Sequence, residues 1–328
     1  MTDRILVLGG TGWVGRRIAE AWLERGARVT VTARGTRSAP AGADLVVTER
    51  DRPGAYFALA ATEWDEVVDV SSEPAHVAQA AAALGDRAAH ATYISSVSVY
   101  ADATRTGADE RAALVEPLSD ADPYDYARAK VAAERAAAAL GARASVIRPG
   151  LIVGPGDRTD RFGYWPARFA AAVAEAVLVP ETTGFRAQVI DVDDLVSFVV
   201  ASGARGFDGT VDAVGHSHPL AEVLTLAREG AGHTGEVVTA PADWLERHGV
   251  AHWAGPRSLP LWLPADMPGF ATRSGAAYRA AGGRIRPLAE TIACVLEDER
   301  RRGLARSRTA GLERAEELAL IEALRAQR

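Results

Sequence analysis

The chain has 328 residues, of which 48% are apolar and 24% are charged, an ordinary composition for a globular protein with a large core. Its net charge of −6, with both signs interspersed, gives no basis for a nucleic-acid or membrane-surface partner. The single cysteine, Cys294, excludes an internal disulfide and a cysteine-based metal site. No run is apolar enough for a transmembrane helix or a signal peptide, so we expect a cytoplasmic protein.

In chain order, the first half of the sequence alternates strands with helices. Apolar and β-branched runs predict strands at 4–10, 27–34, 44–48, 65–70, 91–96 and 144–150. Helical spacing of apolar residues predicts helices at 13–26, 53–61, 74–84 and 123–140. This alternation is typical of the α/β class with a doubly wound parallel Rossmann sheet, which we place at residues 1–150.

The pattern becomes less regular after Gly150. Residues 151–308 predict a smaller, mostly helical substrate lobe that returns in part to the core. Within it, 188–202 is expected to form a short strand and a helix capped by Asp193 or Asp194. The last segment, 309–328, predicts an amphipathic helix that packs on the lobe or contributes to a homodimer surface.

A glycine-rich turn, GGTGWVG, joins the first strand to the first helix. Glycines at 9, 12 and 15 permit a tight turn, so that a pyrophosphate can lie on the free N–H groups of the helix N-terminus. Three spaced glycines are a weak signal alone. At the first strand–helix junction of a βαβ unit they indicate a dinucleotide-binding site.

The spacing Gly9-x-x-Gly12-x-x-Gly15 resembles that of extended short-chain dehydrogenases/reductases, the NAD-dependent epimerase/dehydratase-like proteins. The resemblance covers most of residues 4–300. It implies a catalytic tyrosine with a lysine four residues later, and Tyr126 and Lys130 match. Residues four apart share one helix face, and a nearby ammonium is expected to lower the pKa of the phenol.

Lys130 is the only lysine among the 37 lysines and arginines of the chain. A compact ammonium donates to ribose hydroxyls in a way that a planar guanidinium does not, so this position favours lysine for a chemical reason. The alternative is that Lys130 is an ordinary solvated lysine on a helix, in a chain whose coding bias favours arginine.

The segment 92–102 resembles the family's Ser-Ser/Thr…Val-Tyr segment, which implies that Ser96 holds the substrate oxygen toward Tyr126. The implied catalytic residues are thus Ser96, Tyr126 and Lys130. The implied cofactor-binding residues are Gly9, Thr11, Gly12, Trp13, Val14, Gly15, Arg34, Glu49, Ser71, Ser95, Lys130 and Pro149.

The end of the second strand bears on the cofactor. An acidic residue there would accept from the adenosine ribose and repel a 2′-phosphate, but the sequence offers Arg34 and Arg37 instead. Arginine suits a phosphate through bidentate, charge-assisted bonds, which favours NADP, with NAD as the alternative. The resemblance places Glu49 near the adenine.

Two departures from the family narrow the implied reaction. Val97 and Ser98 replace the Asp-Glu pair of sugar-nucleotide dehydratases, and Gly150-Leu151 replaces the asparagine of sugar-nucleotide epimerases. We expect an NAD(P)-dependent oxidoreductase that transfers a hydride between nicotinamide and a carbonyl or imine of a small molecule, with Tyr126 as acid/base. The alternatives are an NAD-dependent epimerase of a sugar or sugar-like substrate, and a non-catalytic dinucleotide-sensing or RNA-associated protein.

Two further groups carry weaker signals. His216-Ser217-His218 lacks further nearby ligands, so a loop is expected there rather than a metal site. The aromatic run 162–165, with Arg158, Arg161 and Arg168 around it, either lines the substrate pocket or packs the smaller lobe.

Overall fold

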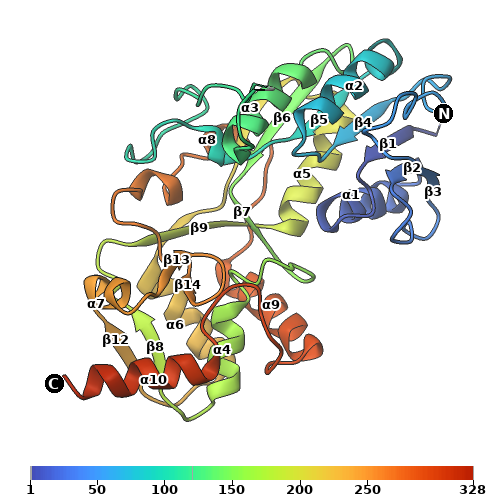
Figure 1. Cartoon of the computed structure of the whole chain (residues 1–328). Coiled ribbons are helices and arrows are strands. Elements are labelled where there is room, and N and C mark those ends of the chain that lie inside the picture. Colours follow the sequence, from blue (N-terminus) through green and yellow to red (C-terminus); the bar gives the residue numbers. More distant parts are fainter. Residues whose placement is uncertain (1, 120, 328) are drawn as a thin grey trace.

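The computed structural model describes residues 2–119 and 121–327, so the outermost residues of the predicted domains, 1 and 328, lie outside it. Seven parallel strands form a central sheet in the order β10-β6-β5-β4-β1-β2-β3 (Figure 1). They are β1 (Arg4–Leu8), β2 (Arg28–Ala33), β3 (Asp44–Val47), β4 (Glu66–Asp69), β5 (Ala91–Ile94), β6 (Ala144–Pro149) and β10 (Gly209–Ala213). The predicted doubly wound Rossmann sheet is confirmed.

Strand β1 shows why the sheet is buried on both faces. Ile5 and Val7 pack into one apolar cluster, whereas Leu6 and Leu8 pack into another on the opposite side. Successive side chains of a strand point to opposite faces, so a continuous apolar run needs helices on each side. They are α1 (Trp13–Glu24) and α5 (Val192–Arg205) on one face, and α2 (Pro74–Leu84) and α3 (Tyr126–Ala137) on the other.

The strand order reverses direction at β1, which pairs with β2 on one side and β4 on the other. Loops that follow β1 and β4 therefore leave the sheet toward opposite faces and open a crevice between them. Residues 9–15 follow β1, and residues 70–72 follow β4. The topology thus places the glycine-rich turn at a crevice where ligands bind in open α/β sheets.

The smaller lobe contains three minor sheets packed with helices (Figure 1). Its strands are β7 (Leu151–Val153), β9 (Arg186–Asp191) and β11 (Ser217–Pro219) in one sheet, β8 (Val177–Pro180) with β12 (Val237–Ala240), and β13 (Ala251–Trp253) with β14 (Ser258–Pro260). Its helices are α4 (Tyr164–Ala172), α6 (Leu220–Ala231), α7 (Ala242–Arg247), α9 (Leu288–Arg302) and α10 (Arg314–Arg325). Helix α8 (Ala276–Ala280) packs on β10 of the central sheet instead. Between these elements, α5 and β10 carry the chain back to the central sheet. None of the helices among the described residues is long and apolar enough to cross a membrane.

Helix α10 packs along β8 and contributes Leu320, Ile321 and Leu324 to the core of the smaller lobe. Glu317 on the same face is fully buried, where it accepts a hydrogen bond from the backbone N–H of Leu178 and pairs with Arg314. The predicted amphipathic character of this segment therefore serves packing within the chain.

Three local predictions are wrong. The loop expected at 216–218 is largely replaced by strand β11, because residues 217–219 pair with β9 along its edge. No helix forms at 53–61, where the chain makes successive turns, because Gly54 adopts a left-handed φ of 78° and the Tyr56 hydroxyl donates to the carbonyl of His76. Helix α5 is capped by Asp191, two or three positions earlier than expected, since its carboxylate accepts from the N–H of Asp193 at 2.9 Å.

Candidate active site

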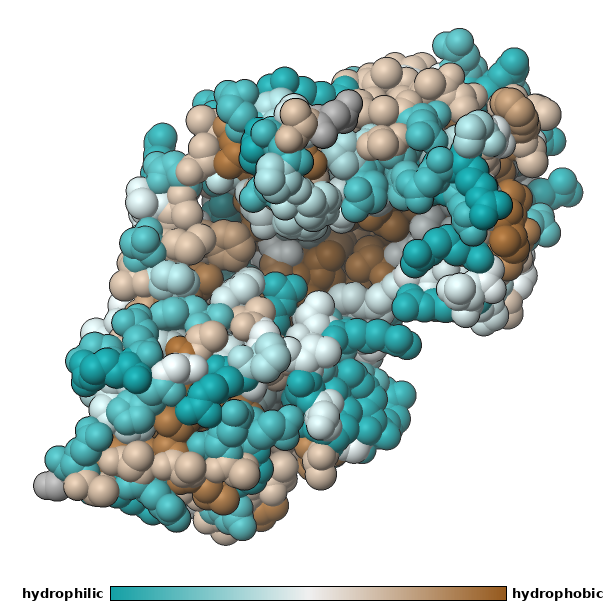
Figure 2. All heavy atoms as spheres, in the orientation of Figure 1, coloured by the Kyte–Doolittle hydropathy of each residue, from teal (hydrophilic) through white to brown (hydrophobic). Residues whose placement is uncertain are grey.

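Two adjoining cavities lie along the carboxyl ends of the strands and share Gly12 and Val70 in their walls. The larger, of about 660 Å³, extends between the sheet and the smaller lobe, and the smaller, of about 430 Å³, lies over the ends of β2 and β4. Figure 2 shows the molecule hollowed in this region, with apolar residues exposed in the hollow. The joint shape is elongated, as a dinucleotide with a substrate at one end requires.

The glycine-rich turn leaves the N-terminus of α1 open. Gly12 is the N-cap residue and supplies no side-chain cap, and the first turn of α1 carries no acidic residue. Gly9 is in the left-handed region, and a Cβ on Gly15 would lie 2.5 Å from the carbonyl oxygen of Gly9. The turn is therefore closed as tightly as glycine allows, with the positive end of the helix dipole facing both cavities.

The remaining residues of this turn divide between the cavities. Thr11 lines the smaller one, whereas Trp13, Val14 and Gly15 line the larger one. The indole N–H of Trp13 donates to the carbonyl of Pro155 at 2.9 Å, which ties the turn to the loop after β7.

Lys130 is almost fully buried, with 3% of its surface exposed, and reaches across to the ends of two strands. Its ammonium donates to the carbonyl of Ser71 at 2.8 Å and to that of Ile94 at 2.7 Å, and lies over the ring of Tyr93. Burial lowers the pKa of Lys130 to about 8, although nearby carboxylates oppose the shift. The side chain also lines the larger cavity.

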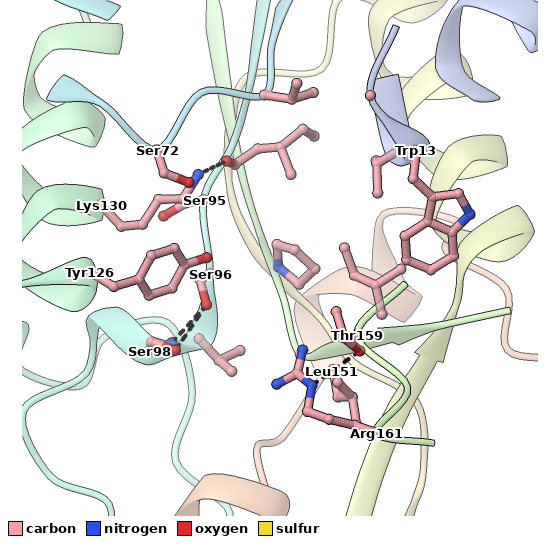
Figure 3. Close-up of a pocket in the computed structure, with 18 of the residues that line it drawn as sticks. Trp13, Ser72, Ser95, Ser96, Ser98, Tyr126, Lys130, Leu151, Thr159 and Arg161 are labelled. Atoms are coloured by element: carbon pink, nitrogen blue, oxygen red, sulfur yellow. Dashed lines mark hydrogen bonds between the residues drawn. The ribbon is translucent and has the colours of Figure 1, made fainter. Parts of the chain in front are cut away.

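Tyr126 and Ser96 face the same cavity from α3 and from the end of β5, with the phenol and the hydroxyl near each other (Figure 3). Desolvation by the surrounding cavity wall raises the pKa of Tyr126 although 43% of its surface is exposed, while the Ser96 hydroxyl and the charge of Arg161 act in the opposite direction. The prediction of a lowered pKa is wrong for this structure, because desolvation of the phenolate outweighs the groups that favour it. The phenol is therefore protonated at neutral pH.

Ser95 and Ser96 have different environments although they are adjacent. The Ser95 hydroxyl is buried and donates to Glu134. The Ser96 oxygen accepts from the N–H of Ser98 at 3.1 Å and caps a short 3₁₀ turn, Val97–Val99. Both serines line the larger cavity, but the Ser95 hydroxyl is bound to Glu134, so Ser96 is the better placed to contact a bound molecule.

The remaining residues that were predicted to bind the cofactor are only partly brought together. Arg34, Arg37 and Ser71 line the smaller cavity, and Pro149 lines the larger one. Glu49 lines neither; its carboxylate pairs with Arg52 at 2.6 Å. The acids that line the smaller cavity are Asp51, two positions later, and Glu73.

Several wall residues of the larger cavity were not predicted as site residues: Ser72, Ser98, Thr159, Trp253 and Phe270. Of the loop whose role was left open, Arg161 lines the cavity, while Phe162, Tyr164 and Trp165 are buried in the lobe core. No sequence signal distinguished these roles, since aromatic loop residues suit a pocket and a core equally. Within the described residues, no group of three or more His, Cys, Asp or Glu side chains is arranged to hold a metal ion.

The model of one protein family, described as the NAD dependent epimerase/dehydratase family, matches residues 5–215. The chain belongs to this family. The match spans the glycine-rich turn, Ser96, Tyr126 and Lys130, so the resemblance inferred from those motifs is confirmed. No curated protein sequence matches the chain.

Solved structures share the fold at low identity. A candidate epimerase from Burkholderia cenocepacia J2315 is 23% identical with a TM-score of 0.70, over 91% of this chain and 98% of that one. The enzyme WbmG of Bordetella bronchiseptica, in complex with NAD and UDP, is 15% identical with a TM-score of 0.67, over 93% and 97%. The UDP-glucose 4-epimerase of Thermus thermophilus, in complex with NAD, is 20% identical with a TM-score of 0.61, over 90% and 99%.

The nicotinamide dinucleotide that the family name implies fits the described residues. The uncapped N-terminus of α1 offers N–H groups and a positive dipole end to a pyrophosphate, and Gly12 leaves room for it. The two cavities extend from this point in both directions, toward Arg34 on one side and Tyr126 on the other.

The glycines allow a direct test of this fit. A Cβ on Gly12 would meet only the Gly9 oxygen, at 3.4 Å, and Gly12 has an ordinary φ of −73°. We expect Gly12→Val to fold, with a thermal unfolding temperature close to that of the wild type, and to lose dinucleotide binding measured by calorimetry. Gly15→Ala is the matched contrast, because the clash with Gly9 should destabilise the fold by about 1–3 kcal/mol. Retained dinucleotide affinity in Gly12→Val would contradict the assignment.

The lowered pKa of Lys130 predicts a pH dependence of cofactor affinity. If the ammonium donates to the bound ribose, the bond is present below about pH 8 and is lost as the pH rises through the pKa of about 8. We expect the dissociation constant of the dinucleotide to increase across that range in the wild type. A guanidinium stays charged there, so Lys130→Arg should bind more weakly but with no such transition. A pH-independent wild-type affinity would refute the role.

Proposed function

We propose that this protein is an NADP-dependent oxidoreductase that transfers a hydride between nicotinamide and a carbonyl or imine carbon of a small molecule. The observation that carries the proposal is that Ser96, Tyr126 and Lys130 line one cavity together with Gly12, at the open N-terminus of α1. A proton-donating phenol, a buried cation and a hydroxyl thus face the space beside the dinucleotide crevice.

A reduced dinucleotide bound along the crevice supplies the hydride. Tyr126 donates its phenolic proton to the substrate oxygen, so that hydride and proton together convert a carbonyl to an alcohol. The raised pKa suits this direction, because it keeps the phenol protonated at neutral pH. Ser96 donates to the same substrate oxygen, and Lys130 supplies positive charge that stabilises the phenolate left behind.

The wall after β6 supports a small substrate over a sugar nucleotide. At Gly150 a Cβ would lie 3.1 Å from a methyl group of Val214, so an asparagine there would have to displace a buried side chain. Leu151, which follows, presents an apolar surface to the cavity. The polar contact that this position would offer a nucleotide diphosphate is therefore replaced by apolar contact.

A second candidate is NAD-dependent epimerisation of a sugar or sugar-like substrate. The family match and the fold shared with the UDP-glucose 4-epimerase of Thermus thermophilus favour it. An epimerase oxidises and reduces its cofactor within one turnover, so it retains the dinucleotide and causes no net change in nicotinamide absorbance. Stoichiometric consumption of NADPH with a carbonyl substrate distinguishes the oxidoreductase.

The preference for NADP rests on Arg34 and Arg37. Both are exposed at the wall of the smaller cavity, and neither forms an ion pair with any residue that the structure describes. Arg50, at the same wall, is already bound by Asp69 at 2.5 Å. The two unpaired guanidinium groups therefore offer the charge that a 2′-phosphate needs.

This preference predicts the effect of Arg34→Ala. We expect NADPH binding to weaken by about 1.5–3 kcal/mol, the contribution of hydrogen bonds to a charged group, while NADH binding is unchanged. Arg52→Ala is the matched control, since Arg52 is exposed nearby but lines neither cavity. Equal weakening of both cofactors by Arg34→Ala, or of neither, would refute the assignment.

The catalytic roles predict the behaviour of Tyr126→Phe and Lys130→Arg. Each should lower NADPH-dependent turnover by at least ~10²-fold, the low end for a positioned acid–base group. The double variant should cost little more than the worse single one, because the two residues act as a unit. Steady-state kinetics on folded variants, verified by circular dichroism, give the measurement. Full activity in either variant would exclude this mechanism.

A further inference from the structure

Among the described residues, Arg161 is the only arginine that lines the larger cavity. Its Nε donates to the Thr159 hydroxyl at 3.3 Å, and its remaining N–H groups have no hydrogen-bond partner in the part of the chain that the structure describes. In Figure 3 the guanidinium points into the cavity, on the side facing Tyr126 and Ser96. A half-buried cation thus faces the proposed reaction site with most of its donors free.

The carboxylates nearest to Arg161 in the chain bind other groups. Asp157 accepts from the N–H and the hydroxyl of Thr159 at 2.8 and 2.9 Å. Asp160, in the left-handed region at φ 58°, is held by Arg302 at 3.2 Å. Asp157 and Asp160 therefore anchor the loop near Arg161. Because both carboxylates are bound to other groups, neither serves as a counter-ion for Arg161.

Burial of this guanidinium has an electrostatic cost. Desolvation lowers the pKa of Arg161, and the charge of Asp157 offsets it only in part. Buried charges in proteins are normally paired, because an unpaired one loses its hydration without compensation. A bound anion would supply the missing partner.

The surroundings of Arg161 are aromatic. Its guanidinium lies 5.1 Å from the ring centre of Trp253, and Phe270 packs edge-on against that indole. Trp253 has a left-handed φ of 66°, a conformation that is unfavourable for a non-glycine residue and is concentrated at functional sites. The backbone N–H of Trp253 donates to the carbonyl of Trp262 at 3.0 Å, and this hydrogen bond holds the strained residue at the cavity wall.

We propose that Arg161 binds a carboxylate of the substrate, so that the protein acts on an oxo acid, or on the matching hydroxy acid, with an apolar body. This inference rests on the oxidoreductase function proposed above. One guanidinium satisfies one carboxylate through two parallel hydrogen bonds, whereas a nucleotide diphosphate would call for more positive charge. Val97, Leu151, Trp253 and Phe270 supply the apolar wall.

The carboxylate itself does not react. The hydride is added to the carbonyl carbon, the phenolic proton of Tyr126 goes to its oxygen, and Arg161 fixes the position of that carbonyl through the carboxylate. Arg161 and Tyr126 line one cavity and influence each other electrostatically, so a substrate whose acid group is near its reacting carbonyl suits both. Two- and three-oxo acids meet this condition.

The test compares oxo acids with their neutral counterparts. A panel of 2- and 3-oxo acids with aliphatic or aromatic side chains is assayed for NADPH oxidation, each beside its methyl ester and its phosphonate analogue. We expect the acids to be preferred, and Arg161→Ala to lower kcat/KM for them by about 10- to 100-fold while the esters change little. Arg161→Lys should recover part of the loss, and Arg158→Ala, an exposed neighbour outside the cavity wall, should have no effect.

Other outcomes overturn the inference. Preference for the esters or the phosphonates, or an equal loss for acids and esters, would exclude a carboxylate site. Weakened NADPH binding by Arg161→Ala without substrate would assign Arg161 to the cofactor.

Failure of the proposed oxidoreductase function can be distinguished from failure of the carboxylate site. In the first case neither the acids nor their analogues would support NADPH oxidation that depends on Tyr126. Calorimetry with the same oxo acids on the NADP-loaded protein then tests the carboxylate site by itself. Binding that Arg161→Ala abolishes supports the carboxylate site, and absence of binding refutes it.

Discussion

Helix α3 presents one polar face to the carboxyl ends of the strands, and the site depends on the hydrogen bonds that join this face to them. Tyr126, Lys130 and Glu134 are spaced by four residues, so they share this face. Lys130 donates to the strand-end carbonyls of Ser71 and Ile94, which joins α3 to two neighbouring strands. Tyr126 is thereby held one helical turn from a buried cation, and backbone carbonyls fix the position of that cation.

Buried polar groups behind this face connect the sheet to the smaller lobe. Glu134 pairs with Arg148 of β6 at 2.7 Å, and Arg148 also donates to the Tyr100 hydroxyl at 2.9 Å. That hydroxyl donates to Asp212 of β10, which accepts from Arg273 of the lobe at 2.8 Å. Removing one member would leave a buried charge without its partner, so the network favours a single relative placement of lobe and sheet. The cavity between them keeps its shape for the same reason.

The contrast between Lys130 and the arginines is one of shape. A compact ammonium donates to two strand-end carbonyls, and a planar guanidinium matches that geometry less well. Elsewhere the buried cations bind carboxylates, as Arg148 binds Glu134 and Arg273 binds Asp212, and there the planar guanidinium is suitable. Arg161 differs from these because its cation faces a cavity and has no carboxylate partner among the described residues.

The sequence alone determined the features that depend on local pattern. Continuous apolar runs, the glycine spacing at 9, 12 and 15, and the four-residue interval from Tyr126 to Lys130 each report a backbone geometry that holds wherever the pattern occurs. The sheet and the polar face of α3 followed from them. The helix expected at 53–61 did not form, since the contact of Tyr56 with the carbonyl of His76 favours turns over helical propensity.

Only the tertiary structure decided the substrate side of the cavity. Arg161 and Trp253 lie far apart in the sequence and meet because the loop between β7 and α4 lies beside β13 within the smaller lobe. The raised pKa of Tyr126 likewise depends on desolvation, which spacing along a helix does not specify. Whether an arginine is paired or free is set by which carboxylates the fold brings within reach, and that is a property of three-dimensional packing.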